Sequence, residues 1–448
     1  MLQDYQILQR NEFGYAIAQV SGQLPIDWDN GDRISVCAFR ENDNLMIQRW
    51  TKAQINDEEW SCNVRLPEGG LYRLEACVHS DDSRCDWSPR IKCVRHIGVG
   101  DLYLITGQSN MAGYGKDIAY DPPCLGVHLY ANNGKWDIAS HPLDDSVDTI
   151  YPENKEVKSA TSPALSFGRR LKQELGVPIG LIQASLGGSS LAMWHPKEDG
   201  SLYQGMMRRL EVIGAVKGVI WYQGCSEAMS GNVEGYLERF SEMVSLWREK
   251  LGDIPILTVQ LNRRQVHVEE KKARDWGMIK EAQRQAARTL PKVYVVPSHD
   301  VPMSDAIHNS SVASVIIGER LALIALQGIY GRTGRKAPDV EWVEYVDATH
   351  IRVHFVEDAL MACTEICGDG KVEEMQVEDC QGLINVNFAQ GNPGELLLTL
   401  ERSMKLPAKF HALWRSKLSS SIPHDVFGMP MLGCYGVDVC QIRFQINE

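Results

Sequence analysis

The chain has 448 residues, of which 44% are hydrophobic and 23% charged, as is usual for globular proteins. Its formal net charge of −12 argues against unassisted binding to nucleic acid or to an anionic membrane surface, because both require a basic protein surface. The length favours roughly three domain units.

The N-terminus lacks the basic start and apolar centre of a secretory signal, and no apolar run approaches the ~20 residues that span a bilayer. We therefore expect a cytoplasmic protein, or a secreted one if a signal peptide has been removed. Twelve cysteines without regular spacing are typical of free thiols in a reducing compartment. We expect no metal and no cofactor; a homo-oligomer is possible.

Residues 1–97 contain short apolar runs separated by turn residues such as Gly69 and Gly70, and no amphipathic helix of useful length. The runs lie at 15–20, 33–39, 60–66 and 72–79. This pattern predicts an N-terminal β-sandwich domain.

From residue 98 the pattern changes to strands that alternate with helices. Apolar runs lie at 102–106, 179–184, 218–222, 256–261 and 293–297. Helical segments are expected at 164–175, 234–251, 275–290 and 312–329. Such alternation predicts an α/β domain over 98–332, with a five-stranded parallel sheet covered on both faces.

The first connection in this domain, from about 113 to 161, is long and rich in turn residues. Connections of this length form binding or lid elements, or else passive surface excursions, and both interpretations stay open.

After a basic, glycine-containing linker at 331–338, the chain returns to a β pattern. Residues 349–356 alternate between apolar and polar side chains, and further apolar runs follow at 383–388, 395–400 and 408–414. We predict a second β domain, again a sandwich, over 337–448.

Ser109 follows the first strand of the α/β domain, after Gly107 and Gln108. A buried parallel strand delivers such a residue to the carboxyl edge of its sheet, where open α/β sheets bind their ligands. Ser109 is therefore a candidate nucleophile; the alternative is a serine that only caps a helix.

Two other strand ends carry groups that could stabilise an oxyanion. Gly187 and Gly188 follow the second strand, where the backbone can approach a ligand and direct an N–H toward it. Gln223 follows the third strand and carries an amide donor. We expect the oxyanion donors to be the N–H groups of Ser109 and Gly188 and the Gln223 amide.

Asp305 and His308 follow the fifth strand. Their i, i+3 spacing would place both side chains on one side of a helical turn. The carboxylate could then orient the imidazole, and the second ring nitrogen could take a proton from Ser109. Ser109, His308 and Asp305 are our candidate catalytic residues.

Four ordered segments between about 98 and 330 resemble the motifs of SGNH-type carbohydrate esterases, specifically the sialate O-acetylesterase-like branch. The segments are Gly107-Gln108-Ser109-Asn110-Met111, Leu181 to Ser189 followed by Trp194, Val219-Ile220-Trp221-Tyr222-Gln223-Gly224, and Asp305-Ala306-Ile307-His308. The resemblance implies a flavodoxin-like three-layer sandwich and metal-independent removal of acetyl groups from sugar hydroxyls. Two positions depart from the family pattern: Cys225 replaces a usual glutamate, with Glu227 two residues later, and Asn309 replaces a usual proline.

The sequence thus favours a serine carbohydrate O-acetylesterase that acts through an acyl-enzyme on sialic acid or on acetylated glycans such as xylan. A non-catalytic carbohydrate-binding protein and a broader acyl esterase or lipase are the alternatives. Arg263, with Arg264, could meet a substrate carboxylate, and His195 and Tyr222 could also line the sugar site. The other predicted substrate contacts are Gln108, Asn110, Trp194 and Trp221.

Overall fold

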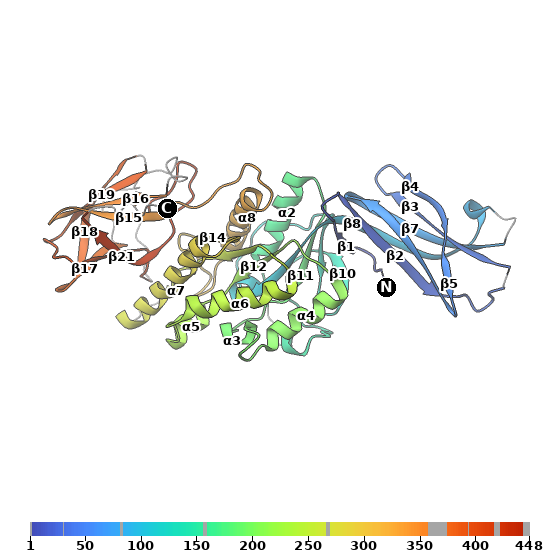
Figure 1. Cartoon of the computed structure of the whole chain (residues 1–448), viewed down its shortest axis with the longest axis horizontal. Coiled ribbons are helices and arrows are strands. Elements are labelled where there is room, and N and C mark those ends of the chain that lie inside the picture. Colours follow the sequence, from blue (N-terminus) through green and yellow to red (C-terminus); the bar gives the residue numbers. More distant parts are fainter. Residues whose placement is uncertain are drawn as a thin grey trace.

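The computed structural model describes residues 2–29, 31–80, 84–155, 159–265, 269–356, 374–392, 394–415 and 422–441. Figure 1 shows three parts along the long axis of the molecule, with an all-β part at each end and a mixed α/β part between them.

Two β-sheets form the N-terminal part and share one core. β2, β6 and β5 make one sheet, and β4, β3, β7, β8 and β1 lie in the other. Along β6, Trp60, Val64 and Leu66 are buried and alternate with exposed residues, so one face of the strand turns inward. The elements are β1 (Ile7–Gln9), β2 (Tyr15–Gln23), β3 (Arg33–Arg40), β4 (Leu45–Lys52), β5 (Gln54–Asn56), β6 (Glu59–Pro67), β7 (Gly69–His79) and the 3-10 helix η1 (Cys85–Trp87).

One long strand, β8 (Arg90–Gly107), belongs to both the N-terminal part and the central sheet. Its first half pairs antiparallel with β7, and its second half pairs in parallel with β11 and β12. The strand passes without interruption through residue 97, where we expected the first domain to end. The backbone that leads to Ser109 is therefore anchored in two sheets.

The central sheet has the strand order β10-β9-β11-β8-β12-β13-β14. All neighbours from β9 to β14 are parallel, and β10 pairs antiparallel with β9. The expected five strands are present, but β9 adds a parallel strand and β10 an edge strand. The strands besides β8 are β9 (Val127–Tyr130), β10 (Trp136–Ile138), β11 (Ile179–Gln183), β12 (Gly218–Tyr222), β13 (Ile256–Val259) and β14 (Val293–Val296).

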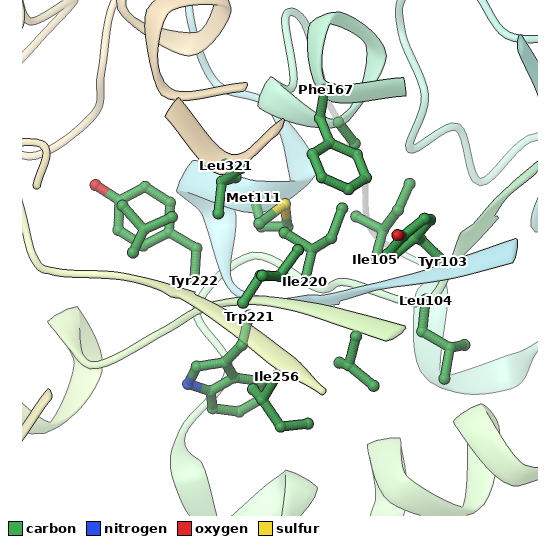
Figure 2. Close-up of a cluster of buried hydrophobic side chains, with 14 of the residues drawn as sticks. Tyr103, Leu104, Ile105, Met111, Phe167, Ile220, Trp221, Tyr222, Ile256 and Leu321 are labelled. Atoms are coloured by element: carbon green, nitrogen blue, oxygen red, sulfur yellow. The ribbon is translucent and has the colours of Figure 1, made fainter. Parts of the chain in front are cut away.

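Helices cover both faces of this sheet (Figure 1). In the core close-up, Phe167 of α2 and Leu321 of α8 lie on one side of the strands and Trp221 points to the other side (Figure 2). α2 begins as predicted, because Ser162 Oγ accepts the Ala164 N–H before the N1 proline. The helical elements are α1 (Ser109–Ala112), η2 (Pro152–Asn154), α2 (Pro163–Leu175), α3 (Leu191–Trp194), α4 (Ser201–Ile213), α5 (Cys225–Ser230), α6 (Tyr236–Leu251), α7 (Glu270–Thr289) and α8 (Ser311–Gly328).

Helix α8 is long and apolar enough to cross a membrane by length and composition alone. It packs against α2, β13 and β14, and 61% of it is buried inside the protein. Its apolar composition is explained by this place in the core.

The C-terminal part is a closed barrel with the order β15-β16-β19-β18-β17-β20-β21. Our expectation of a sandwich is wrong here, because β21 pairs with β15 and removes both sheet edges. The alternation along β16 is as expected, with Ile351, Val353 and Phe355 buried. The strands are β15 (Val340–Asp347), β16 (His350–Phe355), β17 (Met375–Asp379), β18 (Gly382–Asn392), β19 (Glu395–Leu400), β20 (Lys409–Ala412) and β21 (Cys434–Cys440).

Candidate active site

Ser109 lies at a tight turn between the end of β8 and the start of α1. Gly107 makes this turn possible: its φ is +115°, and an added Cβ would lie 2.3 Å from the Tyr222 carbonyl oxygen. Gln108, a predicted substrate contact, is buried and its Oε1 accepts the N–H groups of Gly224 at 3.0 Å and Ser226 at 3.3 Å. Gln108 therefore joins the Ser109 turn to the start of α5.

The structure brings His308 and Asp305 to Ser109. His308 Nε2 lies 3.0 Å from Ser109 Oγ, and His308 Nδ1 lies 2.9 Å from Asp305 Oδ2. The imidazole thus lies between a hydroxyl and a carboxylate, each on its own ring nitrogen. This is the geometry that a serine nucleophile, a base and an orienting acid require.

The segment that carries these two residues is a tight loop and not the helical turn that we expected. An isolated antiparallel bridge joins Met303 to Asn309, and the Ser304 N–H donates to the His308 carbonyl at 2.9 Å. Asp305 Oδ1 accepts the N–H groups of Ile307 at 3.0 Å and His308 at 2.9 Å. The carboxylate therefore shapes the loop with one oxygen and contacts the imidazole with the other.

These contacts keep Asp305 ionised. Partial burial raises the pKa of this carboxyl, but the N–H groups of Ile307 and His308 and the His308 ring outweigh burial and lower the pKa to about 2. Asp305 is therefore a carboxylate across the whole range in which proteins usually function.

Two asparagines hold the loop in place. Asn110, another predicted substrate contact, is buried; its Oδ1 accepts the Asn309 N–H at 2.9 Å and its Nδ2 donates to the Ile307 carbonyl at 3.1 Å. Asn262 Nδ2 donates to the same carbonyl at 2.9 Å. The Asn309 side chain continues this network, donating to the Tyr222 hydroxyl at 3.1 Å. Asn309, which departs from the family pattern, is therefore part of the loop's support.

The N–H groups of Ser109 and Gly188 are the candidate oxyanion donors. Within the described ranges, neither of them donates to a backbone carbonyl. Gly188 has φ +72°, a conformation that favours glycine. Neither N–H group is therefore committed to a backbone hydrogen bond.

Gln223 is not available in the same way, and this part of our prediction needs correction. Its amide nitrogen donates to the Ser189 carbonyl at 3.3 Å and to a carboxylate oxygen of Glu227. Its amide oxygen accepts from the Tyr236 hydroxyl at 3.0 Å. Because both amide hydrogens are committed and the side chain is fully buried, Gln223 supports the loop around Ser189 instead of facing an oxyanion.

Glu227 is the acid that supports this loop. Besides the Gln223 amide, it accepts the Leu191 N–H at 2.6 Å.

Cys225 is buried beside Asn110, whose Nδ2 lies 4.0 Å from the sulfur. Burial raises the pKa of the Cys225 thiol to about 12, so this thiol stays protonated.

The aromatic residues that we expected at a sugar site belong to the hydrophobic core. Trp194 and Trp221 are buried and meet edge to face, with ring centroids 5.5 Å apart. Figure 2 shows Trp221 and Tyr222 within this core. Tyr222 and His195 are buried as well. Alternation along a strand cannot distinguish a core indole from an exposed one.

Arg263 also faces inward: it is buried, and its Nη1 donates to the His299 carbonyl at 3.3 Å. Arg264 is half-buried, and its Nε has no hydrogen-bond partner among the described residues. The next residue, Gln265, donates its N–H to the Ala306 carbonyl at 2.9 Å, so the backbone after Arg264 runs beside the His308 loop.

The sequence did not identify Tyr114 and Lys116. The Tyr114 ring stacks on the His308 ring at a centroid distance of 4.8 Å, and its hydroxyl approaches Gly187, where an added Cβ would lie 2.6 Å away. Lys116 Nζ lies 3.7 Å from Asp305 Oδ2. Both residues come from the long connection after α1, whose length was the only available signal.

Among the described residues, no group of three or more His, Cys, Asp or Glu side chains is placed to hold a metal ion.

Comparisons with known proteins identify the family of this chain. A family model described as "Carbohydrate esterase, sialic acid-specific acetylesterase" matches residues 99–327. No curated protein matches the sequence.

Among solved structures, a carbohydrate acetylesterase from Xanthomonas citri is 22% identical, covers 96% of this chain and 97% of its own, and has a TM-score of 0.70, so all three parts share its fold. A protein from Arabidopsis thaliana is 25% identical over 51% of this chain and 98% of its own, with a TM-score of 0.44. NanS is 17% identical over 52% of this chain and 98% of its own, with a TM-score of 0.41.

Proposed function

Because this chain belongs to the carbohydrate esterase family described as sialic acid-specific acetylesterases, we propose that it removes acetyl groups from sugar hydroxyls with Ser109 as the nucleophile. The observation that carries the proposal is the position of His308, 3.0 Å from Ser109 Oγ through one nitrogen and 2.9 Å from Asp305 through the other. A base so oriented activates a serine hydroxyl.

In the first half-reaction, Ser109 Oγ attacks the acetyl carbonyl carbon while His308 Nε2 takes the hydroxyl proton. The N–H groups of Ser109 and Gly188 stabilise the tetrahedral oxyanion, and such donors are typically worth ~3 kcal/mol each. His308 then gives its proton to the sugar oxygen as the ester bond breaks, which leaves acetyl-Ser109 and a free sugar hydroxyl.

In the second half-reaction, water attacks acetyl-Ser109 and His308 accepts a proton from the water. Collapse of the second tetrahedral intermediate releases acetate, and the proton returns to Ser109 Oγ. Asp305 stays ionised throughout and stabilises the imidazolium that forms in each half.

The sugar is either sialic acid or a neutral acetylated glycan such as xylan. One exposed cationic side chain lies beside the His308 loop: Lys116 Nζ is 3.7 Å from Asp305 Oδ2. A sugar carboxylate bound there would pair with the Lys116 ammonium. Lys116→Ala should therefore lower kcat/KM on acetylated sialic acid about tenfold more than on acetylated xylan oligosaccharides, if sialic acid is the substrate.

Acetate release from acetylated sialic acid, acetylated xylan oligosaccharides and p-nitrophenyl acetate tests the proposal. We expect Ser109→Ala to abolish release, whereas the matched control Ser226→Ala, at a serine that donates to the Gly188 carbonyl at 3.2 Å, retains most of it. Full turnover by Ser109→Ala would rule out Ser109 as the nucleophile. No release by the unmodified protein would favour a binding protein, and turnover that rises with acyl chain length would favour a lipase.

A further inference from the structure

The N-terminal part has an open cavity of about 740 Å³ that the proposed reaction does not use. Its walls come from the β2–β3 connection, the end of β7 and the segment around η1. Its lining includes Asp27, Trp28, Asp32, His79, Arg84 and Trp87.

Two tryptophans give this cavity flat apolar surfaces. Trp28 is half-buried and packs against the N-terminal core, so its ring is held by the fold. Trp87 is 79% exposed and belongs to η1. The Arg84 guanidinium lies 4.7 Å from the Trp87 ring centroid. Exposed apolar surface rimmed by polar side chains is typical of ligand-binding grooves.

The polar side chains that line the cavity can form hydrogen bonds and include charges of both signs. Asp27 is exposed, and Asp32 uses one carboxylate oxygen to accept the Asp29 N–H at 3.1 Å. His79 is fixed by Ser35 Oγ, 2.9 Å from its Nε2. With two carboxylates and one guanidinium, the lining lacks the positive excess that a phosphate-bearing ligand needs.

We propose that this cavity binds a neutral glycan chain, with a sugar ring on the Trp87 indole and sugar hydroxyls hydrogen-bonded to Asp27 and Asp32. A sugar ring has an apolar C–H face that covers an indole, and a hydroxyl edge that donates to carboxylates. Flat aromatic surfaces beside a few polar groups are the composition of a ligand pocket. The cavity would hold the carbohydrate polymer while its acetyl groups are removed elsewhere on the same chain.

The test uses deacetylated glycans, so that binding is independent of ester hydrolysis and of the proposed function. Isothermal titration with xylohexaose and with cellohexaose should show binding to the unmodified protein. We expect Trp87→Ala and Trp28→Ala to weaken it at least tenfold, and Ser109→Ala to leave it unchanged. Phe13→Ala is the matched control, because Phe13 is 74% exposed in the same part but does not line the cavity.

Hydrolysis provides a second readout. Trp87→Ala should release acetate from p-nitrophenyl acetate at the unmodified rate, and more slowly from acetylated xylan. Equal glycan binding by the unmodified protein and Trp87→Ala would overturn the proposal. The proposal would also fail if the unmodified protein bound neither xylohexaose nor cellohexaose. A change of sedimentation coefficient in Trp87→Ala would also overturn it, by showing that a second copy covers this surface.

Discussion

The Tyr114 ring stacks on the His308 ring, with centroids 4.8 Å apart and ring planes inclined by 27°. Tyr114 comes from the long connection after α1, whereas His308 follows β14, so the contact joins two distant segments at the histidine that contacts Ser109. The stack covers one face of the imidazole and restricts its rotation.

Loss of this stack should reduce catalysis. Aromatic pairs of this kind contribute ~0.5–1.5 kcal/mol, so we expect Tyr114→Ala to lower kcat about two- to tenfold. Tyr114→Phe keeps the ring and should stay close to the unmodified rate. Tyr120→Ala is the control, because Tyr120 belongs to the same connection and is 89% exposed. Equal losses in Tyr114→Phe and Tyr114→Ala would instead assign the effect to the hydroxyl.

Asp305→Asn should lower kcat by about 10²–10⁴, because the amide cannot stabilise the imidazolium as a carboxylate does.

The low pKa of the Asp305 carboxyl, about 2, also predicts how this group responds to pH. The carboxylate should stay ionised well below the pH at which an ordinary aspartate protonates. A titration of the Asp305 carboxyl carbon followed by NMR should therefore show no midpoint above about pH 3. A midpoint near the ordinary aspartate value of about 4 would contradict the lowered pKa.

Sequence reasoning located the strands of the central sheet where burial leaves a continuous apolar run, as in β12 at Gly218–Tyr222. It missed β9, whose four residues include His128. This histidine is buried because its Nδ1 lies 2.6 Å from the Tyr5 carbonyl oxygen and its Nε2 accepts the Gly126 N–H. The Tyr5 partner lies far away in the sequence, so the local pattern gives no sign that this polar residue is accommodated inside a sheet.

The difference between a local sequence pattern and a tertiary contact also separates the site residues that the sequence could locate from those that it could not. Ser109, Asp305 and His308 could be identified because strand order brings their segments to one edge of the sheet. Trp221 and Gln223 lie at the same edge, yet their side chains turn into the core, which only tertiary contacts decide. The barrel closure by β21 on β15 also joins strands far apart in the chain, which local alternation cannot reveal.

Glu227→Gln should destabilise the loop that carries Gly188. Glu227 accepts the Leu191 N–H through one oxygen and the Gln223 amide through the other, and the substitution replaces one acceptor with a donor. A buried N–H without an acceptor costs ~1–3 kcal/mol, so the melting temperature should fall by several degrees. Glu234→Gln is the control, with the same change of charge at an exposed position. An unchanged melting temperature in Glu227→Gln would contradict this role.

Asp144 should lower the free energy of unfolding as the pH rises toward 7, because its carboxyl is buried. Burial raises the pKa of this carboxyl to about 7, although hydrogen bonds from Asn132 and Gln183 oppose the shift. Asp144 Oδ2 is buried without a hydrogen-bond partner among the described residues, so an ionised carboxylate there would be incompletely compensated. The neutral acid is therefore the form that the native structure accommodates.

The direction of the pH effect follows from the two states of the chain. An aspartate in the unfolded chain loses its proton near pH 4, whereas native Asp144 keeps it up to about pH 7. Between these pH values the free energy of unfolding falls by at most ~1.4 kcal/mol per pH unit, and above pH 7 Asp144 lowers it no further. Asp144→Asn does not titrate at this position. The difference between its unfolding free energy in urea and that of the unmodified protein should therefore grow in its favour from pH 4.5 to 7. Asp145→Asn, at the exposed neighbouring carboxylate, should show no such growth, and a constant margin for Asp144→Asn would mean that native Asp144 ionises in the usual range.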